Sequence, residues 1–289
     1  AYNIEKFLPE AIESVLSQKT NFKVEMVIGE DCSTDNTRQI ALDYQKKYPE
    51  IIRVLLPEKN LGITPNCIAT HNACKGKYIA LLDGDDYWTD ETKLQKQVSF
   101  LENNPGFSGS AHQAKVIYDY SKHTHDFGQN TDAEYGVTDT ISNRKFHTSA
   151  LVYRKEIWDK VGGIPSSVLI SNDRALYPMI AIFGKIKYLK DSMCVYRKTG
   201  FGISSNATYE QVKTELFMIP WLKKIDAGFP YIRFKSFIHL SIFENPGKIN
   251  LFRLFIHYIL FVFYSFSYFP GNLGDVKYGS IEFFKKLMK

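Results

Sequence analysis

Two hydrophobic periods alternate along the first hundred residues. Apolar side chains in residues 4–16 recur at helical spacing, whereas Val24, Met26 and Ile28 alternate with polar residues as in a strand. The same two patterns predict further helices over about 35–48, 64–76 and 90–102, and further strands over 51–56 and 78–82. Strands that alternate with helices predict an α/β fold with a mostly parallel sheet flanked by helices.

The second half of the chain is less regular. We expect strands near 107–119, a loop-rich stretch after them, a helix over 172–183, and two strands over 186–189 and 193–197. Residues 251–269 are almost continuously apolar, and the tail 251–289 holds 12 of the 42 aromatic residues. We therefore predict an α/β domain over 1–200 and a helical, aromatic-rich region over 201–289.

Composition and charge narrow the class of protein. A chain of 289 residues with 44% hydrophobic and 23% charged residues is not disordered, collagen-like or a coiled coil. Four cysteines without a C-x-x-C pair exclude a disulfide scaffold and fit a reducing compartment, so we predict a cytoplasmic protein. The net charge of +5 lies entirely in residues 201–289. This distribution argues against a nucleic-acid partner and predicts that the tail touches an acidic surface, such as anionic lipid.

Acidic residues gather where two predicted strands end. One cluster occupies residues 30–35, and the other contains Asp83, Asp85 and Asp86 directly after a short apolar strand. Ligands of such sheets sit beyond the carboxyl ends of the strands. Carboxylates this close repel one another unless a cation compensates, and hard oxygen ligands suit Mg²⁺ or Mn²⁺. A solvated acidic turn is the alternative interpretation of the second cluster by itself.

An ordered set of motifs favours a metal site over a solvated turn. The set comprises Tyr2-Asn3, the run from Gly29 to Thr37, Asn60-Leu61-Gly62, the run from Gly76 to Trp88, and the run from Lys93 to Gln97. In order and spacing it resembles the family 2 glycosyltransferases with the GT-A fold, over about residues 1–200. The resemblance implies an inverting enzyme that uses a nucleotide diphosphate sugar and a divalent metal, Mg²⁺ or Mn²⁺.

The resemblance also implies roles on the donor side of the site. Tyr2 would pack against the nucleotide base, and Asp31, with Glu30, would accept hydrogen bonds from it. Asp83 would lie near the ribose and the metal, and Asp85 would coordinate the metal that neutralises the diphosphate. Separately, Asn66 is expected on a helix that faces the nucleotide, although a polar residue in a first helical turn needs no such role.

An acceptor hydroxyl needs a base that removes its proton in the transition state. In the family, a carboxylate at a helix start does this work, and Asp173 matches that position. The alternative role for Asp173 is stabilisation of the helix dipole alone. The resemblance places Thr148 and Ser149 beside the sugar, with strand-end polar residues as the alternative, and Arg197 would contact phosphate. Asn172 and Thr199 are departures from the commoner Glu and His of the family.

The tail has three possible relations to a membrane: it spans, lies on or avoids the bilayer. The apolar stretch 251–269 is interrupted by Arg253 and His257, and Lys285, Lys286 and Lys289 follow. This pattern favours an interfacial helix with basic ends over a span, and a helix packed on the catalytic domain is the alternative. We therefore predict a peripheral protein whose residues 251–289 contact the inner leaflet.

The resulting hypothesis is an inverting glycosyltransferase that moves a sugar from a UDP-linked donor to a hydroxyl of a bacterial surface glycan or lipid-linked glycan. A nucleotidyltransferase and a non-catalytic, membrane-associated scaffold with the same fold are the alternatives. The family also has a strand before the position of Tyr2, in the middle of the nucleotide site. Without it, we expect a truncated sheet with unpaired backbone groups, reduced stability and weak nucleotide binding.

Overall fold

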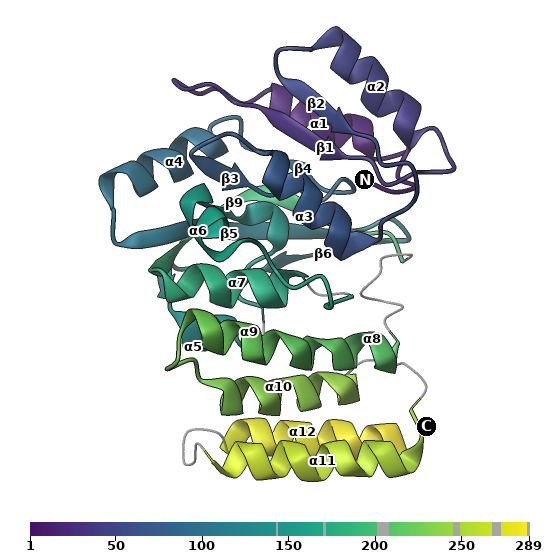
Figure 1. Cartoon of the computed structure of the whole chain (residues 1–289), viewed down its shortest axis with the longest axis vertical. Helices are drawn as coiled ribbons and strands as arrows, with labels where there is room; N and C mark the ends of the chain where they lie inside the picture. The colour runs from purple at the N-terminus through teal and green to yellow at the C-terminus, as the bar shows by residue number, and fades with distance from the viewer. Residues whose placement is uncertain (143, 170–171, 201–207, 245–248, 268–272, 288–289) are drawn as a thin grey trace.

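The chain is layered from its N-terminal strands to its C-terminal helices (Figure 1). The computed structural model describes residues 1–142, 144–169, 172–200, 208–244, 249–267 and 273–287. The N-terminal part contains α1 (Leu8–Leu16), β1 (Met26–Gly29), α2 (Thr37–Lys47), β2 (Ile52–Leu55), α3 (Ile63–Ala73), β3 (Tyr78–Ala80), β4 (Tyr87–Trp88) and α4 (Lys93–Asn103). The middle contains β5 (Phe107–Tyr118), β6 (Ser121–Phe127), β7 (Ala133–Tyr135), α5 (Val137–Thr140), η1 (Thr148–Ala150), β8 (Val152–Arg154), α6 (Lys155–Val161), α7 (Asn172–Ile182) and β9 (Lys185–Lys198). The C-terminal part contains α8 (Tyr209–Lys213), η3 (Thr214–Phe217), α9 (Met218–Ile225), α10 (Tyr231–Glu244), α11 (Leu251–Phe266) and α12 (Leu273–Leu287).

The strands form two sheets. β1 and β2 pair in parallel, and a larger sheet has the order β3-β8-β5-β9-β4, with β6 on β5 and β7 on β9. The predicted α/β class is confirmed, but the larger sheet is mixed rather than mostly parallel. Among the described strands, its one parallel pair is β5–β9, because most of its strands come from the middle of the chain, where α/β alternation gives way to antiparallel pairing.

The two strands predicted over 186–189 and 193–197 are one strand. β9 runs without a break from Lys185 to Lys198. The polar residues between the two apolar runs fall at a shift in register, where Leu189 pairs with His112 and Ser192 with Gln113. A bulge of this kind accommodates extra residues without ending the strand.

The main hydrophobic core extends past residue 200. It joins β5, β8, α6 and α7 to side chains of α9 and α10, including Met218, Leu222 and Phe234. The last two helices share a separate cluster with α10, formed by Leu240, Leu254, Phe261 and Phe283. The division of the chain at residue 200 therefore stays a prediction, while α11 and α12 are added to the outer side of α10 (Figure 1).

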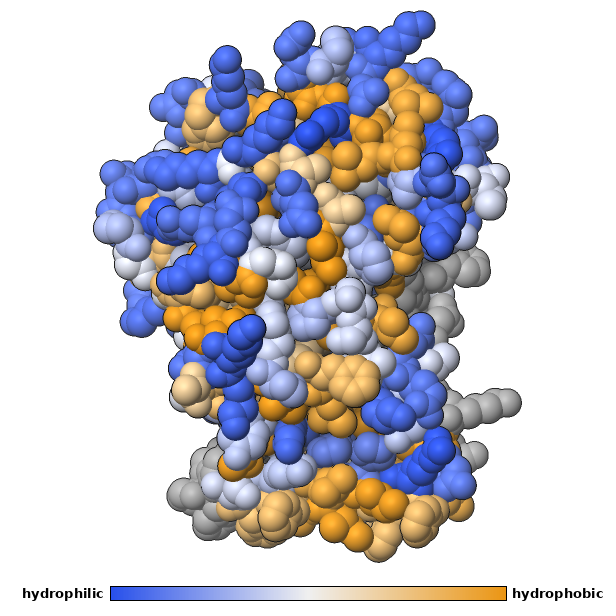
Figure 2. Space-filling model, in the orientation of Figure 1, coloured by the Kyte–Doolittle hydropathy of each residue, from blue (hydrophilic) through white to orange (hydrophobic). Residues whose placement is uncertain are grey.

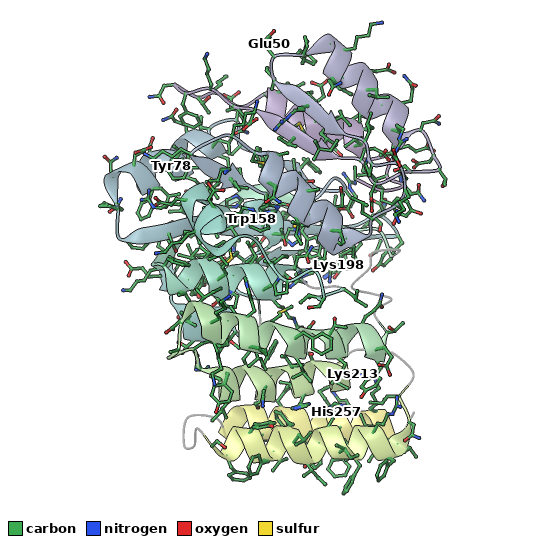
Figure 3. All side chains as sticks on the ribbon, viewed as in Figure 1. Glu50, Tyr78, Trp158, Lys198, Lys213 and His257 are labelled. Atoms are coloured by element: carbon green, nitrogen blue, oxygen red, sulfur yellow. The ribbon has the colours of Figure 1, made fainter. Side chains whose placement is uncertain are left out.

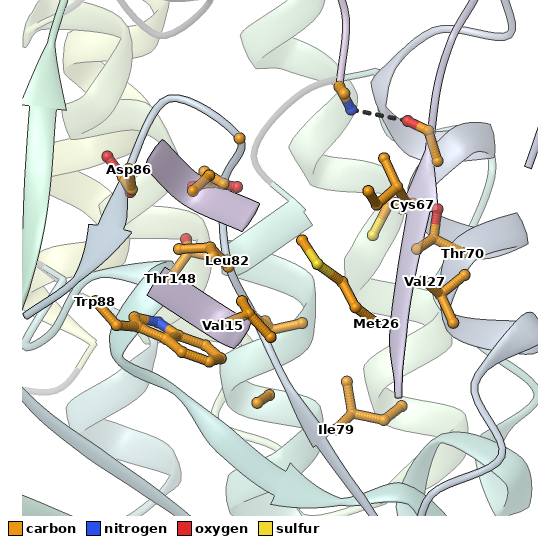
Figure 4. Close-up of a pocket in the computed structure, with 18 of the residues that line it drawn as sticks. Val15, Met26, Val27, Cys67, Thr70, Ile79, Leu82, Asp86, Trp88 and Thr148 are labelled. Carbon is orange, nitrogen blue, oxygen red and sulfur yellow. Dashed lines mark hydrogen bonds between the residues drawn. The ribbon is translucent and has the colours of Figure 1, made fainter. Parts of the chain in front are cut away.

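A large cleft separates β1 from β3. It has a volume of about 2430 Å³ and is lined by apolar side chains of α1, β1 and β3, among them Val15, Met26 and Ile79 (Figure 4). Ala1 lies at one end, where its ammonium donates to the Gly29 carbonyl at 2.8 Å and its carbonyl accepts from the Asp31 N–H at 2.9 Å. β1 and β3 thus belong to different sheets, on either side of a cleft that also contains the acidic loop.

Lys93, at the start of α4, is a buried lysine. Its side chain is fully buried, with Nζ 4.1 Å from the centre of the Trp88 ring and no hydrogen-bond partner among the described residues. Burial lowers the pKa of Lys93 to about 7. Below pH 7 the folded protein therefore carries a buried, unpaired charge. Between pH 7 and about 10 only the unfolded chain keeps that proton, so the stability of the protein rises with pH.

We therefore expect Lys93→Met to raise the free energy of unfolding by about 2 kcal/mol at pH 6, and by less at pH 9. Urea unfolding followed by circular dichroism at both pH values measures this difference. Lys46→Met, at an exposed position of α2, is the control and should change stability by less than about 0.5 kcal/mol. A Lys93→Met protein that is less stable than the wild type at pH 6 would contradict the interpretation.

Candidate active site

The acidic loop between β3 and β4 is fixed by one buried carboxylate. Asp86 is 2% exposed and accepts three hydrogen bonds, from His147 Nε2 at 2.6 Å, Ser149 Oγ at 2.6 Å and the Arg197 N–H at 2.8 Å. These donors come from η1, the residue before it, and β9, so Asp86 ties the loop to two distant parts of the chain. Gly84 lies at the turn against Ile4, whose side chain would meet any Cβ at this position.

The donors around Asp86 are themselves held in place. Ser149 is fully buried, and its hydroxyl also accepts the Asp83 N–H at 3.0 Å. The His147 ring stacks on Tyr196 with ring centres 3.8 Å apart. Burial disfavours the charged form of His147, but the carboxylates of Asp86 and Asp83 outweigh it and raise its pKa. The result is a buried ion pair that presents the rest of the loop to the cleft.

Two carboxylates of the loop remain open to the cleft. Asp83 and Asp85 both line it, and the Asp83 side chain is 52% exposed. The cleft walls displace part of the water around these carboxylates even where they are open, and together with the neighbouring Asp86 they raise the pKa of Asp83 to about 6 and that of Asp85 to about 7. Negative charge is therefore concentrated here beyond what nearby cations neutralise.

The donor set of the loop fits a hard divalent cation. Asp83, Asp86 and His147 bring one potential ligand atom each within 4.8 Å of one another. Both oxygens of Asp86 already accept hydrogen bonds, so its carboxylate is a poor ligand and a good anchor. Asp83 and Asp85, whose carboxylates line the cleft, are better placed as ligands, although Asp83 Oδ2 also lies 3.7 Å from His147 Nε2. They are the two residues that the family resemblance implies as metal ligands, and Mg²⁺ or Mn²⁺ prefers such oxygens.

Asp173 lines the same cleft from the start of α7. Its Oδ2 lies 3.4 Å from Arg144 Nη1, and its Oδ1 accepts the Arg174 N–H at 3.0 Å. The Asp173 side chain is 14% exposed, and its charge acts on Asp83, which places the two carboxylates in one electrostatic environment. The Thr148 hydroxyl is 3.2 Å from the Tyr177 hydroxyl, and Thr148 also lines the cleft (Figure 4).

The residues predicted to bind the nucleotide lie at the end of β1. Tyr2 is 49% exposed and lines the cleft. Asp31 accepts the N–H groups of Leu61 and Gly62 at 2.7 and 2.9 Å, so it fixes the loop that begins α3. Asn66 donates to the Gly29 carbonyl at 3.0 Å and also lines the cleft. These three predicted residues therefore line the cleft that contains the acidic loop, although Asp31 is buried and both its carboxylate oxygens already accept hydrogen bonds.

Three other predicted site residues are buried beneath the cleft surface or already bonded to other protein groups. The carboxylate of Glu30 is fully buried and accepts from the Ser33 N–H and Arg38 Nε. Ser149 is committed to Asp86, as described above. The Arg197 guanidinium contacts Glu10 at 2.5 Å, Asp119 at 3.2 Å and the Asp85 carbonyl at 3.0 Å. In this arrangement all three stabilise the walls of the cleft.

Sequence reasoning passed over the anchoring role of Asp86 and the ion pair of Asp173 with Arg144. The first had a signal, because three carboxylates within four positions repel one another, which favours a separate partner for at least one of them. The second had none, because Arg144 is 29 positions away in an irregular stretch, and nothing in that pattern fixes where it lies.

The family follows from comparison with known proteins. Residues 1–163 match the model of "Glycosyl transferase family 2", which is more than half of the chain and includes the whole acidic loop. The chain belongs to this family. Several of its relatives are themselves named glycosyltransferases, which agrees with the predicted family and fold class.

Three relatives illustrate the match. An uncharacterized glycosyltransferase of Nostoc sp. is 32% identical over 73% of this chain and 67% of its own length. An uncharacterized protein of Mycobacterium tuberculosis is 34% identical over 74% of this chain, which spans 61% of that relative. A Bacillus subtilis protein, TuaG, named provisionally as a glycosyltransferase of teichuronic acid biosynthesis, is 38% identical over 37% of this chain and 42% of its own length.

Solved structures share the fold at low sequence identity. The Staphylococcus aureus protein TarS, in complex with UDP-GlcNAc, has a TM-score of 0.68 and 16% identity, with 99% of this chain and 87% of that chain covered. The mannosyltransferase PcManGT of Pyrobaculum calidifontis, in complex with GDP-Man and Mn²⁺, has a TM-score of 0.58 and 15% identity, covering 97% of this chain and 77% of that chain. At these identities the similarity is one of fold alone.

Proposed function

We propose that the chain is an inverting glycosyltransferase that moves a sugar from a nucleotide diphosphate donor, UDP-linked, to an acceptor hydroxyl. The observation that carries the proposal is the meeting of two features in one cleft. The open carboxylates of Asp83 and Asp85 lie in it, and so does the carboxylate of Asp173. The pair Asp83 and Asp85 suits a metal at the leaving group, and the single carboxylate of Asp173 suits a base for the nucleophile, in a chain that belongs to glycosyl transferase family 2.

On the donor side, we propose that Asp83 and Asp85 hold Mg²⁺ or Mn²⁺, while Tyr2, Asp31 and Asn66 form the nucleotide end of the cleft. A bound divalent ion supplies positive charge where the diphosphate becomes more negative as it leaves. Asp86 and His147 act one layer deeper, because their ion pair holds the loop that carries the ligands. The complex of PcManGT with Mn²⁺ supports a divalent metal in this fold.

On the acceptor side, Asp173 receives the proton of the acceptor hydroxyl. As that oxygen bonds to the anomeric carbon, the bond from this carbon to the diphosphate oxygen breaks, and the nucleoside diphosphate leaves with the electron pair. One displacement inverts the anomeric configuration. Arg144 orients the Asp173 carboxylate through its contact with Oδ2. Thr148, beside Tyr177, is positioned to contact the sugar.

The acceptor that we propose is a growing bacterial surface glycan, carried on lipid at the cytoplasmic face of the membrane. The name of TuaG supports this choice, because that relative is provisionally named as a glycosyltransferase of teichuronic acid biosynthesis. The basic charge of residues 201–289 supports a setting near anionic lipid.

Nucleotide binding tests the donor half of the proposal. We expect calorimetry to detect UDP binding in the presence of Mn²⁺, and we expect at least a tenfold loss of affinity with EDTA or with Asp85→Asn, because diphosphate charge then meets the acidic loop without compensation. Asp132→Asn is the matched control and should bind as the wild type does, because Asp132 is an exposed carboxylate outside the cleft that pairs with the partly buried Lys187. Equal UDP affinity with Mn²⁺ and with EDTA would contradict the assignment of the metal. GDP and dTDP, titrated in parallel, test the preference for UDP.

A further inference from the structure

The last two helices carry an exposed apolar face. Among the large hydrophobic residues that the structure leaves exposed, eleven lie on α11 and α12, namely Leu251, Phe252, Phe255, Ile256, Ile259, Phe263, Phe266, Tyr278, Ile281, Phe284 and Leu287. We call this set the terminal face. Figure 2 shows hydrophobic side chains gathered over the end of the molecule that α11 and α12 form. Soluble proteins seldom leave so many large apolar side chains together on one surface.

The polarity of α11 is inverted relative to a helix on the surface of a soluble protein. Its buried stripe includes the polar residues His257 and Ser265, and its exposed side is almost entirely aromatic and aliphatic. His257 hydrogen-bonds to His239 at 2.8 Å and to the Tyr209 hydroxyl at 3.0 Å, and Figure 3 shows it on the side of α11 that faces α10. Ser265 hydrogen-bonds to Ser236 at 2.7 Å. His257 and Ser265 are therefore satisfied inside the protein beside the buried Leu254 and Phe261, while most of the large apolar side chains of α11 are exposed.

The packing of α12 on α11 is close enough to hold this face as one unit. Gly279 lies against the Phe261 ring, which any Cβ there would meet. The rings of Tyr258 and Phe283 stack with centres 4.1 Å apart, and the Tyr258 and Ser280 hydroxyls are 3.0 Å apart. The terminal face is consequently presented by two packed helices rather than by a loose segment.

Charge at this end of the molecule is positive. The two helices carry four basic residues, Arg253, Lys277, Lys285 and Lys286, against two acidic ones, Asp275 and Glu282. Arg253 is paired with Glu210 at 3.2 Å and Lys285 with Glu282 at 2.7 Å, whereas the exposed Lys277 adds to the positive excess. Lys289 lies outside the described residues. Aromatic side chains flanked by Lys and Arg are typical of proteins that lie at a membrane interface. A two-fold dimer through the terminal face would instead bring two surfaces of the same positive net charge together.

We infer that the terminal face docks on an anionic lipid surface and lies in its interface. No helix in the described parts of the chain is long and apolar enough to cross a bilayer, so α11 and α12 would rest parallel to the surface with their apolar side chains among the acyl chains. The basic residues would contact the headgroups. The inference rests on the proposed function, which gives the enzyme a lipid-linked acceptor. An enzyme docked on the membrane in this way would meet that acceptor at the lipid surface.

Vesicle co-sedimentation tests the inference with the full chain and no nucleotide. We expect binding to phosphatidylcholine vesicles that contain 30% phosphatidylglycerol, and at least tenfold weaker partitioning to phosphatidylcholine alone. The double variant Phe255→Ser/Phe263→Ser should lose at least tenfold in partitioning to the anionic vesicles. Leu169→Ser/Phe217→Ser removes two side chains of similar exposure outside the terminal face and should bind as the wild type does. Lys277→Glu/Lys285→Glu should weaken binding about tenfold, and salt should weaken the wild type similarly.

Two outcomes would overturn the inference. One is equal vesicle binding by the wild type and Phe255→Ser/Phe263→Ser. The other is a wild type that does not sediment with vesicles and has the mass of a dimer by light scattering, while Phe255→Ser/Phe263→Ser has the mass of a monomer. The terminal face would then pack against a second copy of the chain. Since no turnover is measured, failure here leaves the proposed reaction intact, and a protein that binds vesicles but not nucleotide would fail the proposed function alone.

Discussion

Asp173→Asn is expected to lower the rate of sugar transfer by about 10²- to 10⁴-fold, because an amide cannot take the proton of the acceptor hydroxyl. UDP binding should change by less than about threefold, since the variant leaves the acidic loop and the end of β1 untouched. The substitution keeps the shape of the side chain and its contact to the Arg174 N–H at the start of α7. Steady-state kinetics, combined with calorimetry of UDP binding, separates the two effects.

The matched control for this prediction is Asp159→Asn. Asp159 is an exposed carboxylate of α6 that pairs with Lys155, outside the cleft, and its loss should leave the rate unchanged. A rate for Asp173→Asn within tenfold of the wild type would contradict the role of Asp173 as base. If the folded wild type and the variant both bind UDP and neither turns over any donor, the scaffold alternative is favoured, which the departures at Asn172 and Thr199 keep open.

Asp86→Ala is expected to destabilise the protein by about 3 kcal/mol and to abolish metal-dependent UDP binding. The substitution removes the acceptor of three hydrogen bonds and leaves the buried His147 and Ser149 without their shared partner. The loop that presents Asp83 and Asp85 would lose its tie to η1 and β9. Chemical unfolding and UDP calorimetry with Mn²⁺ measure the two consequences.

Asp126→Ala is the control for Asp86→Ala, because it removes a carboxylate from the surface instead of from the buried loop anchor. Asp126 pairs with Lys115 on the surface at 3.2 Å, and both side chains are almost half exposed, so its removal should cost less than about 1 kcal/mol. If Asp86→Ala costs no more than Asp126→Ala, or if it binds UDP and Mn²⁺ as the wild type does, Asp86 is not the anchor of the loop.

The part of the site that the sequence predicts best is the part built from adjacent residues. Asp83 and Asp85 follow a short apolar strand, and neighbouring carboxylates are compatible with a cation or with a solvated turn. The family resemblance is what favours the cation. Asp173 is predicted through the family resemblance, because it matches the position of the family's general base at a helix start. In the structure it lines the same cleft as the acidic loop, which local spacing alone does not fix.

Long-range partners and strand direction were beyond local patterns. The mixed pairing of β5, β8 and β9 depends on which strands the middle of the chain brings together, and hydrophobic periodicity does not encode this. The contact of Arg144 with Asp173 likewise depends on which distant segments the fold brings together. For α11, the pattern shows an apolar stretch interrupted by His257, but it does not show that the polar residue points inward to His239.

The central claim is that this cleft transfers sugar from a nucleotide diphosphate donor, and the most direct measurement is nucleotide release across a donor panel. The protein is incubated with UDP-, GDP- and dTDP-sugars in Mn²⁺ or EDTA, with Asp173→Asn in parallel and a lipid-linked glycan preparation as acceptor. The account predicts that UDP is released from one UDP-sugar, with Mn²⁺ and not with EDTA, and that Asp173→Asn loses this release. A folded, UDP-binding protein that releases no nucleotide from any donor would contradict it.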